Sequence, residues 1–176
     1  PFPGREWYRS RSQKTDLNLY AKGNIHLSAA WNAYVDVQFR TVGYRMLGTA
    51  DKFLPLDSDN TYSFFNPKFG LTHQISEKSK VYGSVSAGSK EPSRQDFVDN
   101  PGAAPRPEYL QDYELGYEQS GSRYGLQLNG YFMNYQDQLV LTGAVNSTGD
   151  AIRTNVEKSY RLGLETVLNY QISKRL

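Results

Sequence analysis

The amino-acid sequence predicts an all-β protein: an antiparallel up-and-down meander that forms a segment of a large transmembrane β-barrel. Two observations predict it. Apolar and polar residues alternate with a period of two along seven stretches, and short connections alternate with long ones. A barrel that turns every second side chain to lipid averages to a hydrophilic sequence. The mean hydropathy of −0.66, beside 14% aromatic residues, therefore agrees with a membrane barrel.

The seven expected strands share one pattern, in which one set of alternate residues is apolar and the other is polar. They cover residues 13–27, 31–45, 62–75, 80–90, 109–119, 123–135 and 159–172. The polar sets mix Asn, Gln, Ser and Tyr with charged residues, as expected of a lumen lined by hydrogen-bonding side chains. We expect these residues to face the lumen: Asp36, Gln38, Arg40, Asp112, Glu114, Glu118, Asn129, Tyr131, Arg161 and Glu165.

The connections indicate an orientation. Short turns are expected at 28–30, 76–79, 120–122 and 173–175, and long polar segments at 46–61, 91–108 and 136–153. In a meander, odd and even connections lie at opposite rims, and short turns opposite long external loops are typical of outer-membrane barrels. Aromatic residues near the strand ends are expected to form interfacial girdles: Trp31, Tyr62, Phe64, Tyr113, Tyr135, Tyr160 and Tyr170.

Composition excludes several other classes. No run of about 18 apolar residues is present, so no transmembrane helix is expected. The absence of cysteine excludes a disulfide scaffold, and a net charge of +2 gives a nucleic-acid partner no electrostatic support. Both ends read as cut, the first in a loop and the last in a turn, and seven strands do not close a bacterial barrel. The chain is therefore expected to be a partial barrel domain, residues 1–176, without barrel closure.

Several segments over about 60–176 together resemble the barrel of TonB-dependent outer-membrane receptors of Gram-negative bacteria. They are Asn66–Leu71, Lys80–Val85, Lys90–Phe97, Pro107–Tyr117, Tyr131–Val140 and Thr154–Glu165. The resemblance implies a 22-stranded barrel around a plug, with the plug itself absent here. It also implies uptake of a scarce nutrient, such as an iron-siderophore, haem, cobalamin or an oligosaccharide. The implied partners are outer-membrane lipid, that small-molecule nutrient and the TonB energy-transducing complex.

Catalysis finds little support in the sequence. His26 and His73 fall on different strands without a partner at metal-ligand spacing, and no HExxH, GxSxG or phosphate-binding glycine loop occurs. His26 is expected to form hydrogen bonds in the lumen, and His73 to lie near the interface. The lumen carboxylates are better explained by cross-strand pairing with Arg161, Arg40 and Lys22 than as a glycosidase pair. We therefore expect no enzyme, no cofactor and no metal site.

The long connections hold the candidate ligand-binding residues. In 91–108 these are Glu91, Arg94, Asp96 and Phe97, and in 46–61 the candidate is Phe53. Arg94 suits an anionic ligand, because a guanidinium makes two-pronged contacts with such groups. The alternative is that Glu91, Arg94 and Asp96 pair with one another and hold the connection over the barrel mouth.

Two short motifs and two other functions complete the alternatives. The acidic run 57–60 faintly suggests calcium ligands but is better explained as a solvated loop, and Asn146–Thr148 is read as a hairpin turn. A passive outer-membrane porin or adhesin barrel is the nearest rival function. A soluble carbohydrate-binding β-sandwich is the other.

Overall fold

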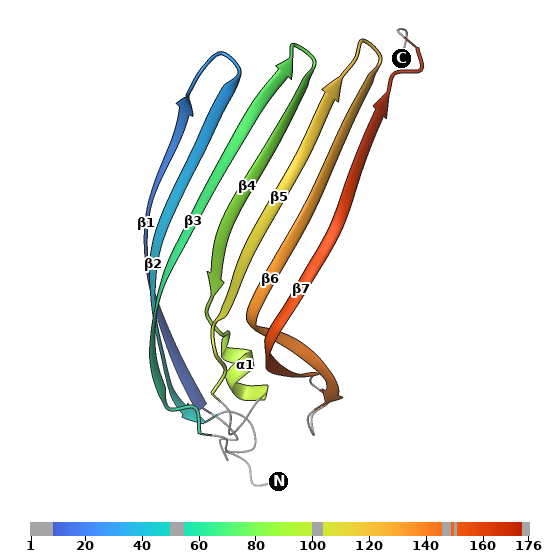
Figure 1. The fold of residues 1–176 in the computed structure, drawn as a ribbon. Coiled ribbons are helices and arrows are strands. Elements are labelled where there is room, and N and C mark those ends of the chain that lie inside the picture. The colour runs from blue at the N-terminus through green and yellow to red at the C-terminus, as the bar shows by residue number, and fades with distance from the viewer. Residues whose placement is uncertain (1–8, 50–54, 100–103, 146–148, 150, 174–176) are drawn as a thin grey trace.

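A computed structural model describes residues 9–49, 55–99, 104–145, 149 and 151–173. The described chain forms one seven-stranded antiparallel sheet in which each strand pairs with the next along the sequence (Figure 1). Its strands are β1 (Arg9–His26), β2 (Trp31–Thr49), β3 (Ser58–Ser76), β4 (Ser79–Lys90), β5 (Glu108–Ser120), β6 (Tyr124–Val145) and β7 (Ala151–Tyr170). The predicted all-β meander is confirmed. A β-sandwich is excluded for this part of the chain, because these strands lie in one sheet rather than two.

The pairing register sorts alternate residues onto two faces. Asp36, for example, lies opposite Lys22 on β1 and Lys68 on β3, and Lys68 in turn lies opposite Ser86. Followed from β1 to β7, the register places the ten residues expected to face a lumen on this one polar face. The opposite, apolar face carries the predicted Leu, Val, Ile and Phe residues.

The strands are longer than expected, and one predicted loop is wrong. Residues 136–153 were expected to be a long polar connection, but β6 continues to Val145 and β7 begins at Ala151. The two strands stay paired from Gln138–Val156 to Leu141–Arg153, because Leu139, Val140 and Leu141 extend the strand-forming sequence. Asp137, at a positive φ of 54°, marks the irregular point where the extension starts.

Shorter and longer connections still alternate along the chain. Residues 27–30, 77–78 and 121–123 join strands at one end of the sheet, which we call the turn end. Residues 50–57, 91–107 and 146–150 join them at the other, which we call the loop end. The connection at 91–107 is much longer than the others at this end.

This connection also contains a helix that the sequence analysis missed, α1 (Arg94–Asp99). Its start is a capping box, with Ser93 and Asp96 at the required spacing. The Ser93 amide and hydroxyl both donate to Asp96 Oδ2 at 2.7 Å, and the Asp96 amide lies 3.4 Å from Ser93 Oγ. The Ser-x-x-Asp spacing was the available sequence signal.

The sheet curls toward its polar face. On one side of α1, Phe97 and Val98 pack against Tyr44 and Met46 of β2, while on the other α1 contacts β7. A helix of six residues can reach both only if distant strands of the sheet bend around it. The polar face is therefore concave at the loop end, as it would be inside a closed barrel (Figure 1).

Candidate functional site

The apolar face carries a band of exposed hydrophobic side chains across the strands. On β3, for example, the band runs from Phe65 to Ile75, about the 9–11 residues that a tilted strand needs to cross a bilayer. Exposed members include Leu17, Leu19, Ile25, Leu27, Phe39, Phe69, Leu71, Val85, Leu115, Leu162, Leu164 and Leu168. So large a contiguous apolar surface indicates contact with a nonaqueous environment. Among the described residues, no helix has the length and apolar character needed to cross a membrane.

Aromatic rings border the band at both ends. At the turn end Trp31 stacks on His73 with ring centroids 4.2 Å apart, which agrees with the interfacial position expected for His73. At the loop end Tyr113, Phe132 and Tyr160 form a row across β5–β7, with successive centroids 6.2 and 6.1 Å apart. Such rings are enriched where a membrane protein meets the polar headgroups.

Three predicted girdle residues are placed wrongly. The register puts Tyr62, Phe64 and Tyr135 on the polar face, where they lie opposite Val42, Arg40 and Leu110. Their nearness to strand ends suggested a girdle, but a residue's face is set by its position in the two-residue alternation.

On the polar face, the buried carboxylate of Glu91 is the centre of an ion-pair network at the loop end. Its carboxylate accepts from Lys14 Nζ at 2.6 Å and from Arg40 Nη1 at 2.8 Å, and only 8% of its surface is exposed. Arg40 also pairs with Asp16, with Nη2 2.6 Å from Oδ2. Burial raises the pKa of Glu91, but the hydrogen bonds from Lys14 and Arg40 outweigh it and hold the pKa below its ordinary value.

The other residues predicted for this connection are also held by the protein. Arg94 Nη2 donates to Ser10 Oγ at 3.1 Å, and Asp96, 4% exposed, caps α1 and lies 3.7 Å from Arg153 Nη1. Phe97 packs beside Tyr44, with ring centroids 6.4 Å apart. The structure therefore gathers four of the five candidates at one place, the inward-folded end of the polar face. Phe53 lies outside the described residues.

The proposed mutual pairing of Glu91, Arg94 and Asp96 is not what the described residues show. Glu91 pairs with Lys14 and Arg40, Arg94 with Ser10, and Asp96 with Ser93 and Arg153. Charge pairs along the polar face do run across strands, as expected for Lys22 and Arg40, but some of the partners differ from those expected. Arg161 lies over the Tyr135 ring at 5.2 Å, Lys22 pairs with Asp36 at 3.3 Å, and Glu118 pairs with Lys80 at 2.9 Å. Cross-strand register, which the sequence alone did not supply, sets these partners.

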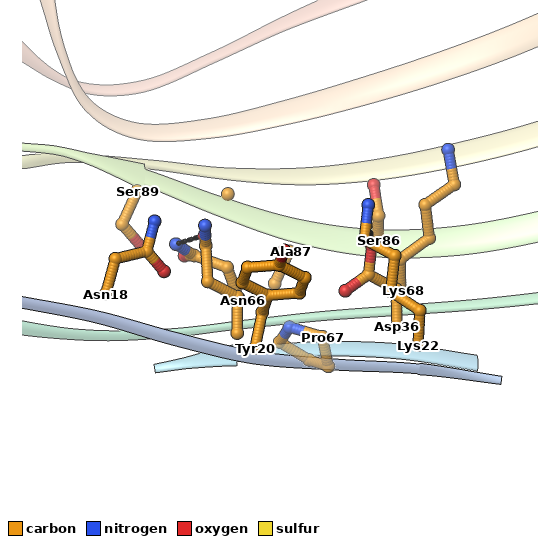
Figure 2. A pocket seen from close by; sticks show the side chains of 12 residues that line it. Asn18, Tyr20, Lys22, Asp36, Asn66, Pro67, Lys68, Ser86, Ala87 and Ser89 are labelled. Atoms are coloured by element: carbon orange, nitrogen blue, oxygen red, sulfur yellow. Dashed lines mark hydrogen bonds and ion pairs between the residues drawn. The ribbon is translucent and has the colours of Figure 1, made fainter. Parts of the chain in front are cut away.

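Further toward the turn end, the polar face is hollowed. Figure 2 shows side chains from β1–β4 projecting into this open hollow of about 580 Å³. The Tyr20 ring is exposed there, and Asn66 Nδ2 donates to Gln38 Oε1 at 3.0 Å. Asn66 Oδ1 is buried without a hydrogen-bond partner, so the hollow retains an unused acceptor. This hollow was not predicted.

The remaining candidates, His26 and Asp57, form hydrogen bonds within the protein. His26 makes a side-chain hydrogen bond with Asn32, in keeping with a polar-face role. Asp57 Oδ1 accepts from the Gly48 amide at 2.8 Å and so helps to close the β2–β3 connection. Among the described residues, no three His, Cys, Asp or Glu side chains group as a metal site.

Comparison with known proteins agrees with this geometry. The family model described as "TonB dependent receptor-like, beta-barrel" matches residues 1–175. The chain belongs to this family of receptor barrels. The family places it in the outer membrane and among transport receptors rather than enzymes.

Solved structures share the fold at low identity. A copper transporter, OprC, superposes with a TM-score of 0.78 at 12% identity, over 93% of this chain and 28% of its own length. The iron transporter FrpB from Neisseria meningitidis (F3-3 variant) has a TM-score of 0.69 at 16% identity, over 94% of this chain and 25% of its own length. The ferric yersiniabactin uptake receptor FyuA from Yersinia pestis has a TM-score of 0.65 at 16% identity, over 98% of this chain and 27% of its own length. This chain thus spans about a quarter of the length of each. No curated protein matches it by sequence.

Proposed function

We propose that this receptor barrel captures a scarce nutrient in its external loops and passes it through a plugged lumen, with energy from the TonB complex. The observation that carries the proposal is the described first part of the connection, residues 91–99, which folds back onto β1 and β2 at the loop end of the polar face. A connection in this position would meet a ligand entering from outside. The plug and the TonB contact would be supplied by parts of the receptor other than these strands.

The cargo is one of four classes: an iron-siderophore, haem, cobalamin or an oligosaccharide. The three similar structures named above are described as a copper transporter, an iron transporter and a ferric yersiniabactin receptor, which favours a metal chelate. Charge supports the same choice. Lifting the connection would uncover Lys14 and Arg40 beside Arg94, and such clustered cations suit an anionic chelate.

Glu91, Arg94, Asp96 and Phe97 have distinct roles in this proposal. Glu91 holds the connection in place by occupying Lys14 and Arg40. Asp96 keeps α1 formed by capping it, and this fixes where Arg94 and Phe97 lie. Arg94 and Phe97 are the residues we expect to contact the cargo, one through charge and the other through its ring.

Uptake by intact cells tests the proposal. The full-length receptor is expressed in a receptor-deficient strain, with and without TonB, and supplied with one labelled member of each cargo class. We expect one class to accumulate only when TonB is present. Equal uptake without TonB would contradict the proposal and identify a passive barrel.

The affinity of the cargo for the purified full-length receptor tests the role proposed for Arg94. Removing a charge-assisted hydrogen bond costs about 1.5–3 kcal/mol, so Arg94→Gln should weaken cargo binding about 10- to 100-fold. Arg123→Gln, in the 121–123 turn at the opposite end, is the matched control and should leave binding unchanged. Equal affinities for the two variants would remove Arg94 from the cargo site.

A further inference from the structure

Neighbouring strands of the sheet do not all stay paired as far as the loop end. The β2–β3 ladder reaches the first residue of β3, and the β4–β5 ladder reaches the last residue of β4. The β3–β4 ladder, in contrast, stops at the pair Lys68–Ser86, and the two strands diverge beyond it (Figure 1). Pro67, the first residue of β3 past that pair, has no N–H to donate, which restricts proline to strand edges. We call the unpaired stretch, residues 58–67 of β3 and 87–90 of β4, the seam.

The seam interrupts the barrel wall. The hollow at its foot is lined by Asn66, which the two-residue alternation assigns to the polar face. It is also lined by Pro67, Ala87 and Ser89, which the same alternation assigns to the apolar face. A continuous sheet would keep these two sets of residues on opposite sides.

Side chains reach across the seam. Phe64 of β3 packs edge-to-face on Tyr109 of β5 with ring centroids 6.3 Å apart, although β4 lies between these strands in the sheet order. Three side-chain atoms of β3 along the seam are buried without a hydrogen-bond partner among the described residues: Ser58 Oγ, Asn60 Nδ2 and Asn66 Oδ1. Buried polar groups normally have partners, and strands without a ladder open at lower cost than paired strands. The described wall should therefore part first at the seam.

Residues 91–99, which we call the strap, link the two sides of the seam. Toward β1–β3, the Glu91 carboxylate accepts hydrogen bonds from Lys14 Nζ and from both terminal nitrogens of Arg40. Phe97 adds an apolar contact with β2. Toward β4–β7, the strap continues covalently from β4, and α1 contacts β7. Glu91 is thus the exchangeable end of the strap, because its partners are side chains.

We propose that the strap holds the seam closed, and that the barrel mouth widens between β3 and β4 when Glu91 leaves its two cations. The pair Lys68–Ser86 is the hinge of this movement, because the ladder resumes there. In the proposed function the connection covers the polar face, whereas here it also controls the width of the wall itself. The inference is independent of the cargo.

The test measures the width of the mouth in the full-length receptor, reconstituted in lipid without cargo. Spin labels at two exposed residues, Thr61 of β3 and Lys158 of β7, lie on opposite sides of the seam, and pulsed electron paramagnetic resonance gives the distances between them. Loss of one partner of a buried ion pair favours opening by about 5- to 150-fold, so Glu91→Gln should raise the population at longer distances by that factor. Labels at Lys78 and Gln171, at the turn end, should keep their wild-type distances.

Two results would overturn the proposal. Unchanged Thr61–Lys158 distances in Glu91→Gln would show that the strap does not hold the seam, and equal lengthening at the turn end would mean that the whole barrel loosens. Glu77→Gln, the matched control in the 77–78 turn, should leave both label pairs unchanged. If Glu91→Gln does not fold, Lys14→Gln removes one of the two cations and should lengthen the same distance, and no lengthening there would equally contradict the proposal. Because no cargo is present, a seam that stays closed leaves the proposed uptake untouched, and a barrel without uptake can still widen.

Discussion

The two faces of this sheet are built from alternate residues of the same strands, yet they satisfy their side chains in opposite ways. On the polar face, charged groups are held by protein partners, as Arg40 is by Asp16 and Glu91 and Lys22 is by Asp36. On the apolar face, residues such as Leu115 and Leu164 are 71% and 72% exposed. Side chains on the polar face are therefore satisfied by contacts with other protein groups, whereas side chains on the apolar face need contact with lipid. Exposure of an apolar residue here marks the membrane boundary rather than a poor fold.

The largest effect should come from a charge placed on the apolar face. Leu128, near the middle of the band on β6, lies between Tyr117 and Thr166. Leu128→Arg should destabilise the full-length barrel by about 2–4 kcal/mol, because a buried charge at the bilayer midplane loses its hydration. Equilibrium unfolding by denaturant in lipid vesicles measures the change.

The matched control is the adjacent residue on the other face. Gln127→Arg adds the same charge beside Glu118, to which Gln127 Nε2 already donates at 3.4 Å. We expect a change below about 0.5 kcal/mol. If both arginines destabilised equally, the assignment of the two faces would be wrong.

The next effect concerns the network that holds the connection at 91–107. Glu91→Gln removes a carboxylate that serves both Lys14 and Arg40, and leaves two cations without their shared anion. We expect local opening of α1 to become easier by about 1–3 kcal/mol. Hydrogen exchange of the α1 amides in the full-length receptor reports this directly. Glu77→Gln, at the turn end, should leave α1 protection unchanged.

Glycines on the two faces should respond differently to an added methyl group. On the polar face the Tyr131 ring lies directly over Gly163, so Gly163→Ala must displace it and should cost about 1–3 kcal/mol. On the apolar face, a Cβ added at Gly130 would meet one atom within 4 Å among the described residues other than its chain neighbours, the Leu115 carbonyl oxygen at 3.8 Å. Gly130 also lines an open apolar hollow. Gly130→Ala should change unfolding by less than about 0.5 kcal/mol. If Gly163→Ala and Gly130→Ala destabilised the barrel equally, the Tyr131 ring would not explain a difference between the two glycines.

The smallest expected effect is a pH dependence of the same connection. Because the pKa of Glu91 is lowered in the fold, its stabilising contribution is present above the ordinary value of 4.5 and is lost as the pH falls through the folded value. Protection of the α1 amides, corrected for intrinsic exchange, should therefore hold from neutral pH to about 4.5 and decline below it. Glu91→Gln should flatten this decline, and an unchanged profile in that variant would assign the effect to another group.

Much of the fold could be predicted from the sequence, because period-two alternation fixes the face of each residue without knowledge of its neighbours. The ten expected lumen residues share a face for this reason. Tyr62 and Phe64 were misassigned because nearness to a strand end was given more weight than alternation. The partners of Glu91 could not be predicted, since they depend on how a long connection folds back onto β1 and β2.

The assignment of the two faces is tested most directly by fluorescence at two adjacent residues of β7, Leu164 and Glu165. Single cysteines at these positions in the full-length receptor are labelled with a small environment-sensitive dye and reconstituted in vesicles. We predict that brominated lipid quenches the label at Leu164 and that aqueous iodide does not, with the reverse at Glu165. Equal quenching of both labels by either agent would contradict a sheet with one face toward lipid and the other toward a lumen.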